Sequence, residues 1–410
     1  MPDRYLRLGR HAVARVRNQL TAGRFARRTA AAGQPGSGGV VLFFATGPEN
    51  AYQLEQWRRP LERLARLLPV FVVVDRPDTG ELVLRTTGLP VTLARGSAAL
   101  EELVRVHDVR VVLYCNQVEP NFRMLRFAAP VHVQIGHGES DKASSVSIQH
   151  KAYDLVLVGG AAGRERLGRA LRGFDADTRT VAVGRPQLDF QHPGAPDWPR
   201  DSGRRVWYAP TWEGDRPTIA YGSVASHGVA VVEALLAEPD VRVVYRPHPR
   251  TGQASAADAA ADRTIRGLLR ARGDRHLVDL GGYGWQWAFA DACITDISAV
   301  AYDWLATAKP LLVTEPVNPL AYRPPSPLLD ALELLPADQA GDVVARLAAV
   351  ARPSPRRTGE QSGQQTGPDG GAHPAPLTLA ALAEHYFGDT SPGASSLRFE
   401  EAVLAAASRP

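Results

Sequence analysis

Short apolar runs that alternate with helical patterns are the feature that most limits what this chain can fold into. The runs expected as strands cover 40–45, 70–75, 109–115, 131–135, 154–158 and 180–183, and then 205–209, 241–245, 277–280, 292–294 and 311–314. Helical spacing of apolar residues fills 49–68, 98–107 and 227–236. Apolar strands separated by helices indicate parallel sheets that are covered on both faces. We therefore expect an α/β fold.

The length of 410 residues and a break rich in Pro, Gly and Asp at 193–203 indicate two domains. Two Rossmann-like domains with parallel sheets facing across a cleft form the arrangement called GT-B, in which ligands bind beyond the carboxyl ends of the strands. The expected organisation is a basic amphipathic arm and linker at 1–39, Rossmann-like domains at 40–200 and 201–350, a low-complexity, disordered loop at 351–377 and a helical tail at 378–410 that closes the domain.

The stretch 290–303 is typical of a strand that runs into a helix. It predicts a buried strand at 292–294, a polar turn from Thr295 to Ser298 and a helix from Ala299. Ser298 suits the N-cap position, where its hydroxyl can accept a hydrogen bond from an early backbone N–H. The N–H groups and the dipole of such a helix attract a phosphate. The alternative is an ordinary corner with a capping serine.

Two histidines follow expected strands. His137 lies between two glycines within 134–142, and a neutral imidazole at a strand end suits a general base. His248 lies between two prolines, and Arg246 precedes them, a combination that suits an oxyanion or a phosphate. The alternatives are a turn histidine without chemistry and a rigid loop whose histidine only packs.

Other motifs are weaker. Lysine occurs only at positions 142, 151 and 309, so Lys142 and Lys309 are of interest as compact cations in a chain that otherwise uses arginine. The segment 208–215 places Thr211 in a turn after a strand, where it could serve a site or only pack between domains. The turn at 183–189 favours a structural use.

Metal and cofactor motifs are not found in the sequence. There is no His-Glu-x-x-His, no paired-cysteine motif, no Gly-x-Gly-x-x-Gly, no Walker A pattern and no Gly-x-Ser-x-Gly. Cys115 and Cys293 lie in apolar runs and are expected as buried thiols. We therefore expect neither a metal nor a cofactor.

Residues 1–30 carry eight arginines against a single acid, Asp3, with apolar residues interspersed. This pattern predicts a basic amphipathic helix that binds an anionic membrane surface. A solvated arm and a helix packed on its own domain are the alternatives. Nucleic acid is not expected as a partner, because no module with aromatic and basic residues follows. No apolar run reaches the roughly 18 residues of a membrane helix, and no signal peptide is indicated, so we expect a cytoplasmic protein.

Taken in order, the motifs resemble those of the CDP-glycerol glycerophosphotransferase family, the teichoic-acid primases and polymerases. The resemblance runs from about Val131 to about Val403. It is carried by His137-Gly138 with Lys142, by 184–189, by 208–211, by 246–248, by 295–303 with Lys309, and by 386–389 with Ser395 and Ser396. Four positions depart from the family pattern. It has tyrosine and serine where this chain has Ile297 and Ala299, and the turn before the domain boundary has Arg185 and Gln187 in unusual places.

This resemblance implies a transferase that moves a polyol phosphate from a CDP-activated donor to a hydroxyl of a lipid-linked glycan or a growing teichoic-acid or capsule-type polymer, with release of CMP. It implies His137 as general base and His248 with Arg246 on the diphosphate. The residues it implies for donor phosphate or nucleotide are Lys142, Thr211, Arg246, Thr295, Asp296, Ser298 and Lys309. The domain 40–200 would take the acceptor and 201–350 the CDP donor.

With such an acceptor, the basic arm would hold the protein on the inner face of the cell membrane. Two alternatives remain at this point. One is a GT-B glycosyltransferase or epimerase that uses a nucleotide sugar. The other is a non-catalytic scaffold at the membrane.

Overall fold

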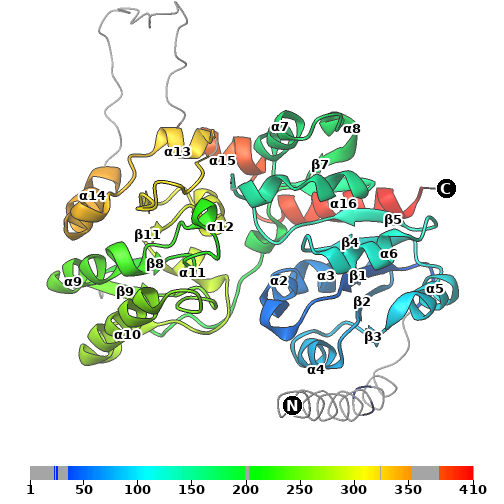
Figure 1. Ribbon diagram of the computed structural model, residues 1–410, viewed down its shortest axis with the longest axis horizontal. Coiled ribbons are helices and arrows are strands. Elements are labelled where there is room, and N and C mark those ends of the chain that lie inside the picture. Colours follow the sequence, from blue (N-terminus) through cyan, green and yellow to red (C-terminus); the bar gives the residue numbers. More distant parts are fainter. Residues whose placement is uncertain are drawn as a thin grey trace, which may run out of the picture. The chain divides into compact units, whose positions relative to one another are not determined.

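A computed structural model describes Gly23, Phe25 and residues 36–141, 143–198, 203–323, 325–351 and 378–409. The rest of the basic arm, Lys142 and nearly all of 351–377 lie outside the described residues. The chain divides into two compact units (Figure 1). The first takes Met1–His137, Val146–Phe190 and Phe387–Pro410, and the second takes Gly138–Ser145 and Gln191–Tyr386.

The first unit is built on a seven-stranded parallel sheet in the order β3-β2-β1-β4-β5-β6-β7. Its strands are β1 (Val40–Phe44), β2 (Val70–Val74), β3 (Val91–Leu93), β4 (Val111–Tyr114), β5 (Val131–Gln134), β6 (Leu155–Val158) and β7 (Thr180–Ala182). Its α-helices are α2 (Ala51–Glu55), α3 (Arg58–Leu64), α4 (Pro77–Thr86), α5 (Gly96–Val106), α6 (Phe122–Leu125), α7 (Ala161–Ala170), α8 (Ala176–Arg179) and α16 (Ala394–Ala407).

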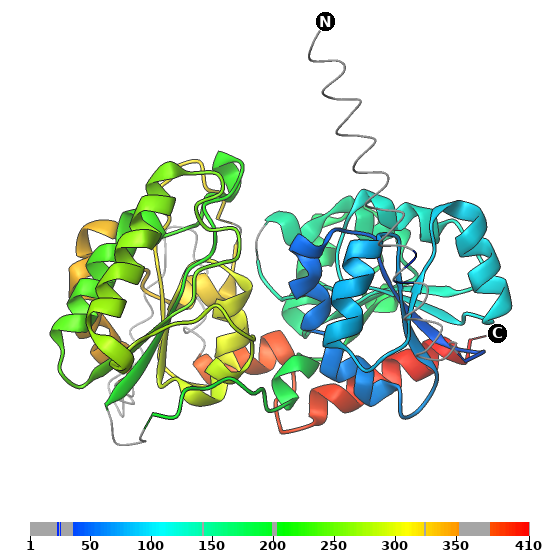
Figure 2. The ribbon, with the colours of Figure 1, turned by 90° about the horizontal axis from the view of Figure 1, so that it is seen from below.

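Both faces of the first sheet are buried. Along β1, Val40, Leu42 and Phe44 pack in one core cluster, while Val41 and Phe43 pack in a second cluster, because successive side chains of a strand point to opposite faces. The first of these clusters also contains Phe399 of α16. The helix α16 is drawn in red in Figure 2, beside this sheet. A helix from the far end of the chain therefore completes the core of the first unit.

The second unit holds a five-stranded parallel sheet in the order β10-β9-β8-β11-β12. Its strands are β8 (Arg204–Ala209), β9 (Val241–Tyr245), β10 (Leu277–Val278), β11 (Ala292–Thr295) and β12 (Leu311–Val313). Its α-helices are α9 (Val229–Ala237), α10 (Ala256–Ala271), α11 (Trp285–Phe289), α12 (Ala299–Leu305), α13 (Pro327–Ala331), α14 (Val343–Ala351) and α15 (Leu379–Phe387).

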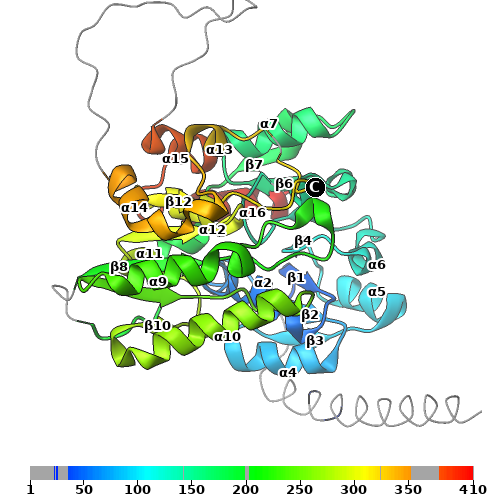
Figure 3. The ribbon, with the colours of Figure 1, turned by 60° about the vertical axis from the view of Figure 1, so that its left-hand side comes forward.

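The two faces of the second sheet are covered by different helices. On one face, Val206 and Tyr208 pack in a cluster to which α9, α10 and α14 contribute, and Figure 3 shows α9 beside α10. On the other face, the Trp207 ring lies 5.9 Å from the ring of Trp304 in α12. The predicted α/β class with two parallel sheets is confirmed.

Some details differ from the prediction. The helix expected over 49–68 is a 3-10 turn at Pro48–Asn50 followed by α2 and α3. The helix expected from residue 227 is preceded by a π-helical turn at Val224–Gly228. The expected tail at 378–410 is divided, because α16 belongs to the first unit, whereas α15 lies in the second up to Tyr386. None of the helices in the described ranges has the length and hydropathy of a membrane span.

Candidate active site

In the second unit, most of the residues predicted for the donor follow the carboxyl ends of neighbouring strands. Because parallel strands end at one edge of the sheet, the residues after β8, β9, β11 and β12 come together there. They are Thr211 after β8, Arg246 and His248 after β9, Asp296 and Ser298 after β11, and Thr314 after β12.

Asp296 is a fully buried carboxylate that joins three of these segments. One oxygen accepts the backbone N–H groups of Thr211 at 2.7 Å and Ser223 at 3.2 Å, and the other accepts the hydroxyl of Thr314 at 2.6 Å. Burial raises the pKa of Asp296 to about 6, although these hydrogen bonds oppose the shift. The carboxylate of Asp296 thus forms hydrogen bonds within the protein that hold the loops after β8 and β12 in place.

Thr295 and Ser298 form the turn between β11 and α12. The Thr295 hydroxyl donates to the carbonyl of Ala209 at 2.7 Å and lies 3.2 Å from the Ser298 hydroxyl. Ser298 occupies the N-cap position of α12, as predicted, but its side chain makes no capping hydrogen bond. The predicted cap bond is therefore wrong, because the Ser298 hydroxyl pairs with that of Thr295.

His248 is held in one tautomer by a neighbouring backbone group. Its Nδ1 accepts the backbone N–H of Arg250 at 3.1 Å. A ring nitrogen that accepts an N–H carries a lone pair, so the proton of the neutral imidazole is on Nε2. The His248 ring also lies nearly parallel to the Trp212 indole, with 6.4 Å between ring centroids. His248 is therefore set up as a hydrogen-bond donor through Nε2.

Arg246 has a buried acidic partner. Its guanidinium is 2.6 Å from Asp279, whose side chain is 5% exposed, and it also donates to the carbonyl of Gly282 at 3.2 Å. Gln286 donates to the same carboxylate oxygen of Asp279 at 2.6 Å. The positive charge of Arg246 is therefore partly compensated before any donor binds.

Lys309 is placed at the end of α11 rather than among the residues after the strand ends. Its ammonium group donates to the carbonyls of Ala290 at 2.6 Å, Trp287 at 2.8 Å and Ala288 at 3.4 Å. Three carbonyls match the three N–H donors of an ammonium group. Burial lowers the pKa of Lys309. This geometry is typical of a lysine that caps the C-terminus of a helix, and not of a lysine that binds a phosphate.

His137 lies in the first unit, in the turn after β5. Its Nδ1 is 2.9 Å from the carbonyl of Cys115, so Nδ1 carries the proton and Nε2 the lone pair. Burial and the nearby positive charge of Arg185 lower the pKa of His137, while the bond to Cys115 opposes the shift. His137 is therefore a neutral imidazole whose Nε2 can accept a proton, the opposite setting to that of His248.

Residues that the motifs did not single out hold the His137 turn. The Trp57 indole donates to the carbonyl of Gly136 at 2.5 Å, and Gly136 has a φ of +62°, which favours glycine. Arg185 donates to the His137 carbonyl at 3.3 Å and to Gln56 at 3.1 Å. The departure from the family pattern at Arg185 was the one sign of this support in the sequence.

The segment Gly138–Ser145 belongs to the second unit although the chain on both sides belongs to the first. Asp141 is buried and accepts the hydroxyls of Ser326 and Tyr386, each at 2.5 Å. A Cβ on Gly138 would lie 2.7 Å from the Cβ of Ala299, so a glycine is needed opposite the start of α12. Lys142, which follows Asp141, lies outside the described residues.

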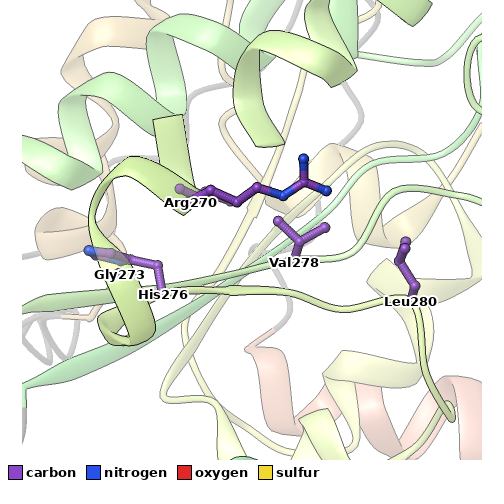
Figure 4. A pocket seen from close by; sticks show the side chains of 6 residues that line it. Arg270, Gly273, His276, Val278 and Leu280 are labelled. Atoms are coloured by element: carbon purple, nitrogen blue, oxygen red, sulfur yellow. The ribbon is translucent and has the colours of Figure 1, made fainter. Parts of the chain in front are cut away.

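A separate cavity of about 200 Å³ lies between the end of α10 and β10 (Figure 4). Its walls are Leu269, Arg270, Gly273, His276, Val278 and Leu280. Burial and the surrounding arginines lower the pKa of His276 to about 4. The cavity contains none of the residues predicted for the site. In the parts of the chain that the structure describes, no group of three or more His, Cys, Asp or Glu side chains is placed to hold a metal ion.

Comparison with solved structures shows the fold. A histidine-to-asparagine variant of the wall teichoic acid polymerase TagF with CDPG is 12% identical, with 98% of this chain and 96% of that chain covered and a TM-score of 0.57. A putative UDP-N-acetylglucosamine 2-epimerase from Listeria monocytogenes is 13% identical, with coverages of 90% and 96% and a TM-score of 0.55. An S. aureus MnaA–UDP structure is 13% identical, with coverages of 89% and 94% and a TM-score of 0.55. These likenesses confirm the GT-B-like class.

Comparison of the sequence itself is more specific. A search among curated proteins gave no match. A family model described as CDP-Glycerol:Poly(glycerophosphate) glycerophosphotransferase matches residues 132–317, a little under half of the chain. This region begins in β5 just before His137 and includes Thr211, His248 and Asp296. Residues 132–317 therefore resemble the CDP-glycerol glycerophosphotransferase family, and this similarity supports an enzyme of that type.

Proposed function

We propose that this enzyme transfers a polyol phosphate, glycerol phosphate or a similar group, from a CDP-activated donor to a hydroxyl of a lipid-linked glycan or a growing polymer of the teichoic-acid or capsule type. The main observation behind the proposal is that the histidines of two family motifs differ in which ring nitrogen carries the proton. His137 offers a lone pair at Nε2, whereas His248 offers an N–H at Nε2. The transfer removes a proton from the acceptor hydroxyl and releases an anion. It therefore uses one proton acceptor and one hydrogen-bond donor.

In the proposed reaction, Nε2 of His137 takes the proton of the acceptor hydroxyl as its oxygen attacks the β-phosphorus of the donor. The new bond joins that oxygen to phosphorus, and the bond between the β-phosphorus and the bridging oxygen breaks. CMP leaves with the electron pair. Negative charge that develops on the diphosphate is stabilised by positioned donors, which is the main contribution a protein makes to phosphoryl transfer.

The second unit would bind the CDP donor, and the first unit the acceptor. We assign His248, Ser298, Thr211 and Lys142 to the donor phosphates or nucleotide. Arg246 would contribute its positive charge from its place beside Asp279. Thr295, Asp296 and Lys309 would support the site from inside, because their side-chain groups already have protein partners.

The direct test is release of CMP by the purified protein given CDP-glycerol and a lipid-linked acceptor. His137→Ala should retain donor binding, measured as a thermal shift with CDP-glycerol, but lose turnover by about 10²–10⁴-fold, the usual contribution of a general base. Near-normal turnover in this variant would remove His137 from the proposal. Stabilisation by UDP-sugars, with none by CDP-polyols, would instead favour the epimerase or glycosyltransferase alternative, whose fold this chain shares.

We also propose that the basic arm holds the enzyme on an anionic membrane at the cytoplasmic face. The eight arginines of residues 1–30 support this placement. Phe25, however, is buried in the core of the first unit, where it packs on α4 so closely that a Cβ on Gly80 would lie 2.5 Å from its ring. The deletion should therefore stop at residue 22, so that the core stays intact.

Removal of residues 1–22 should lower co-sedimentation with anionic vesicles and leave CMP release to a soluble acceptor unchanged. Vesicles of neutral lipid are the control, since arginine binds them weakly. Equal co-sedimentation of the full-length and shortened proteins would show that the arm does not anchor the enzyme.

A further inference from the structure

Glu213, in the loop after β8, makes an unusual set of contacts. One carboxylate oxygen accepts the backbone N–H of Gly252 at 3.0 Å, and the other accepts those of Ala254 at 2.7 Å and Ser255 at 3.1 Å. Ser255 is the N-cap of α10, a helix of 16 residues. Charge-assisted bonds and the helix dipole both favour a carboxylate in this place. Glu213 therefore joins the loop after β8 to the loop after β9.

The two joined loops meet again at His248. Trp212 precedes Glu213, and the guanidinium of Arg250 lies 3.6 Å from the centroid of its indole ring. The His248 ring is nearly parallel to the same indole, with an interplanar angle of 27°. The backbone N–H of Arg250 is also the donor that fixes Nδ1 of His248. The position of His248 thus depends on Trp212 and Arg250, which come from the loops that Glu213 connects.

A glycine sets the local backbone conformation of each of the two loops. Gly214 has a φ of +81°, and a Cβ there would lie 2.7 Å from the carbonyl oxygen of Ile219. Gly252 has a φ of +78°, and a Cβ there would lie 2.8 Å from the Cα of Ala259. Both backbones turn in a conformation that favours glycine, at the residue after Glu213 and at one of the residues whose N–H it accepts. The Glu213 carboxylate thus joins two loops whose own conformations each depend on a glycine.

We propose that Glu213 is a positioning residue of the transfer reaction, which holds the loop 211–214 on the loop 246–252 and thereby keeps His248 oriented with its proton on Nε2. The proposal rests on the proposed role of His248 in donor binding. Glu213 itself touches no substrate. Its carboxylate accepts three backbone N–H groups and so holds the two loops together. The ring of His248 is therefore already oriented when the donor phosphates bind.

The decisive variant is Glu213→Ala, which removes the carboxylate but leaves all three N–H donors in place. We expect turnover to fall on the order of 10²-fold, because a small misplacement of a catalytic group has effects of this size, while the KM for CDP-glycerol changes little. Added formate should restore a large part of the turnover by occupying the vacated position, and chloride at the same ionic strength should not. Glu233→Ala removes an exposed glutamate from α9 and should behave like the unchanged protein.

A second measurement does not depend on the donor. Nitrogen-15 NMR of the histidine rings should show His248 protonated at Nε2 in the unchanged protein and as a mixture of tautomers in Glu213→Ala. If no CDP-polyol yields CMP with the unchanged protein, the proposed function fails, and the tautomer result still decides the role of Glu213. Unchanged turnover and an unchanged His248 tautomer in Glu213→Ala would overturn the proposal, as would a loss that formate does not restore in a variant that is folded by circular dichroism.

Discussion

At the residue scale, hydrogen-bond partners decide what each candidate side chain can do. His137 and His248 are chemically identical, yet a carbonyl beside one Nδ1 and an N–H beside the other give them opposite roles. The sequence indicated both histidines because they follow apolar runs. It could not indicate their tautomers, because the groups that set them are backbone atoms whose positions depend on the loop conformation.

Asp296 should make the stability of the protein depend on pH. Its folded pKa of about 6 lies above the ordinary value of 3.8, so the folded state binds this proton more tightly than the unfolded state does. The stability that this proton contributes is complete below about pH 4 and is lost as the pH rises through about 6. Asp296→Asn does not titrate, so relative to the unchanged protein its free energy of unfolding should improve from pH 4 to pH 7, by no more than about 3 kcal/mol.

The measurement is urea unfolding of both proteins at several pH values. Asp330→Asn, which changes an exposed carboxylate on α13, is the control for the removal of a carboxylate. A difference between Asp296→Asn and the unchanged protein that is constant with pH would contradict the expected titration of Asp296.

At the scale of single elements, the case of Lys309 shows how a motif residue can serve a helix rather than a ligand. Lys309→Met keeps the aliphatic stem but leaves the carbonyls at the end of α11 without their cation. We expect the free energy of unfolding to fall by about 1–3 kcal/mol, the usual effect of leaving buried polar groups unsatisfied. The affinity for CDP-glycerol, measured by calorimetry, should change little.

Lys151→Met provides the comparison, since Lys151 donates to one carbonyl, that of Arg172. If Lys309→Met had normal stability and much weaker donor binding, the result would support the role in donor binding that was predicted for Lys309 from the sequence.

Most elements could be predicted because burial on both faces leaves a clear apolar run, as in Val40–Phe44 and Val241–Tyr245. The strand Val91–Leu93 was missed because it has three residues, of which Val91 alone is fully buried. The helix start at Ala299 was found, but the Ser298 cap bond was not made, because Thr295 offers a second hydroxyl that sequence spacing cannot rank against a backbone N–H. Local propensity was thus enough to predict the turn between β11 and α12, whereas tertiary packing determines which hydrogen bonds its side chains make.

At the scale of the whole molecule, the two-sheet architecture was predictable, but the assignment of the chain ends was not. The sequence treats 378–410 as one tail, whereas α16 packs in the first unit. The Phe399 ring lies 5.1 Å from that of Trp57, and Glu400 pairs with Arg63 at 2.6 Å. Contacts between residues so distant in the chain leave no periodic signal near either partner.

The role of α16 can be tested with two neighbouring apolar residues. Phe399 is fully buried, and Phe399→Ala should lower the free energy of unfolding by about 3–5 kcal/mol in urea titrations. Leu397 is 52% exposed, and Leu397→Ala should cost less than about 0.5 kcal/mol. Equal effects of the two substitutions would show that α16 does not complete the core.

The chain leaves the first unit after residue 190 and returns to it at residue 387. During synthesis on the ribosome, the seventh strand of the first sheet therefore emerges long before the helix that covers its core. The second unit, which lies almost wholly within residues 191–386, is complete first. A nascent chain that ends before residue 394 would leave exposed the surface around Trp57 that Phe399 covers in the complete protein. The core of the first unit, although its strands are synthesised early, is therefore completed only when α16 has been made.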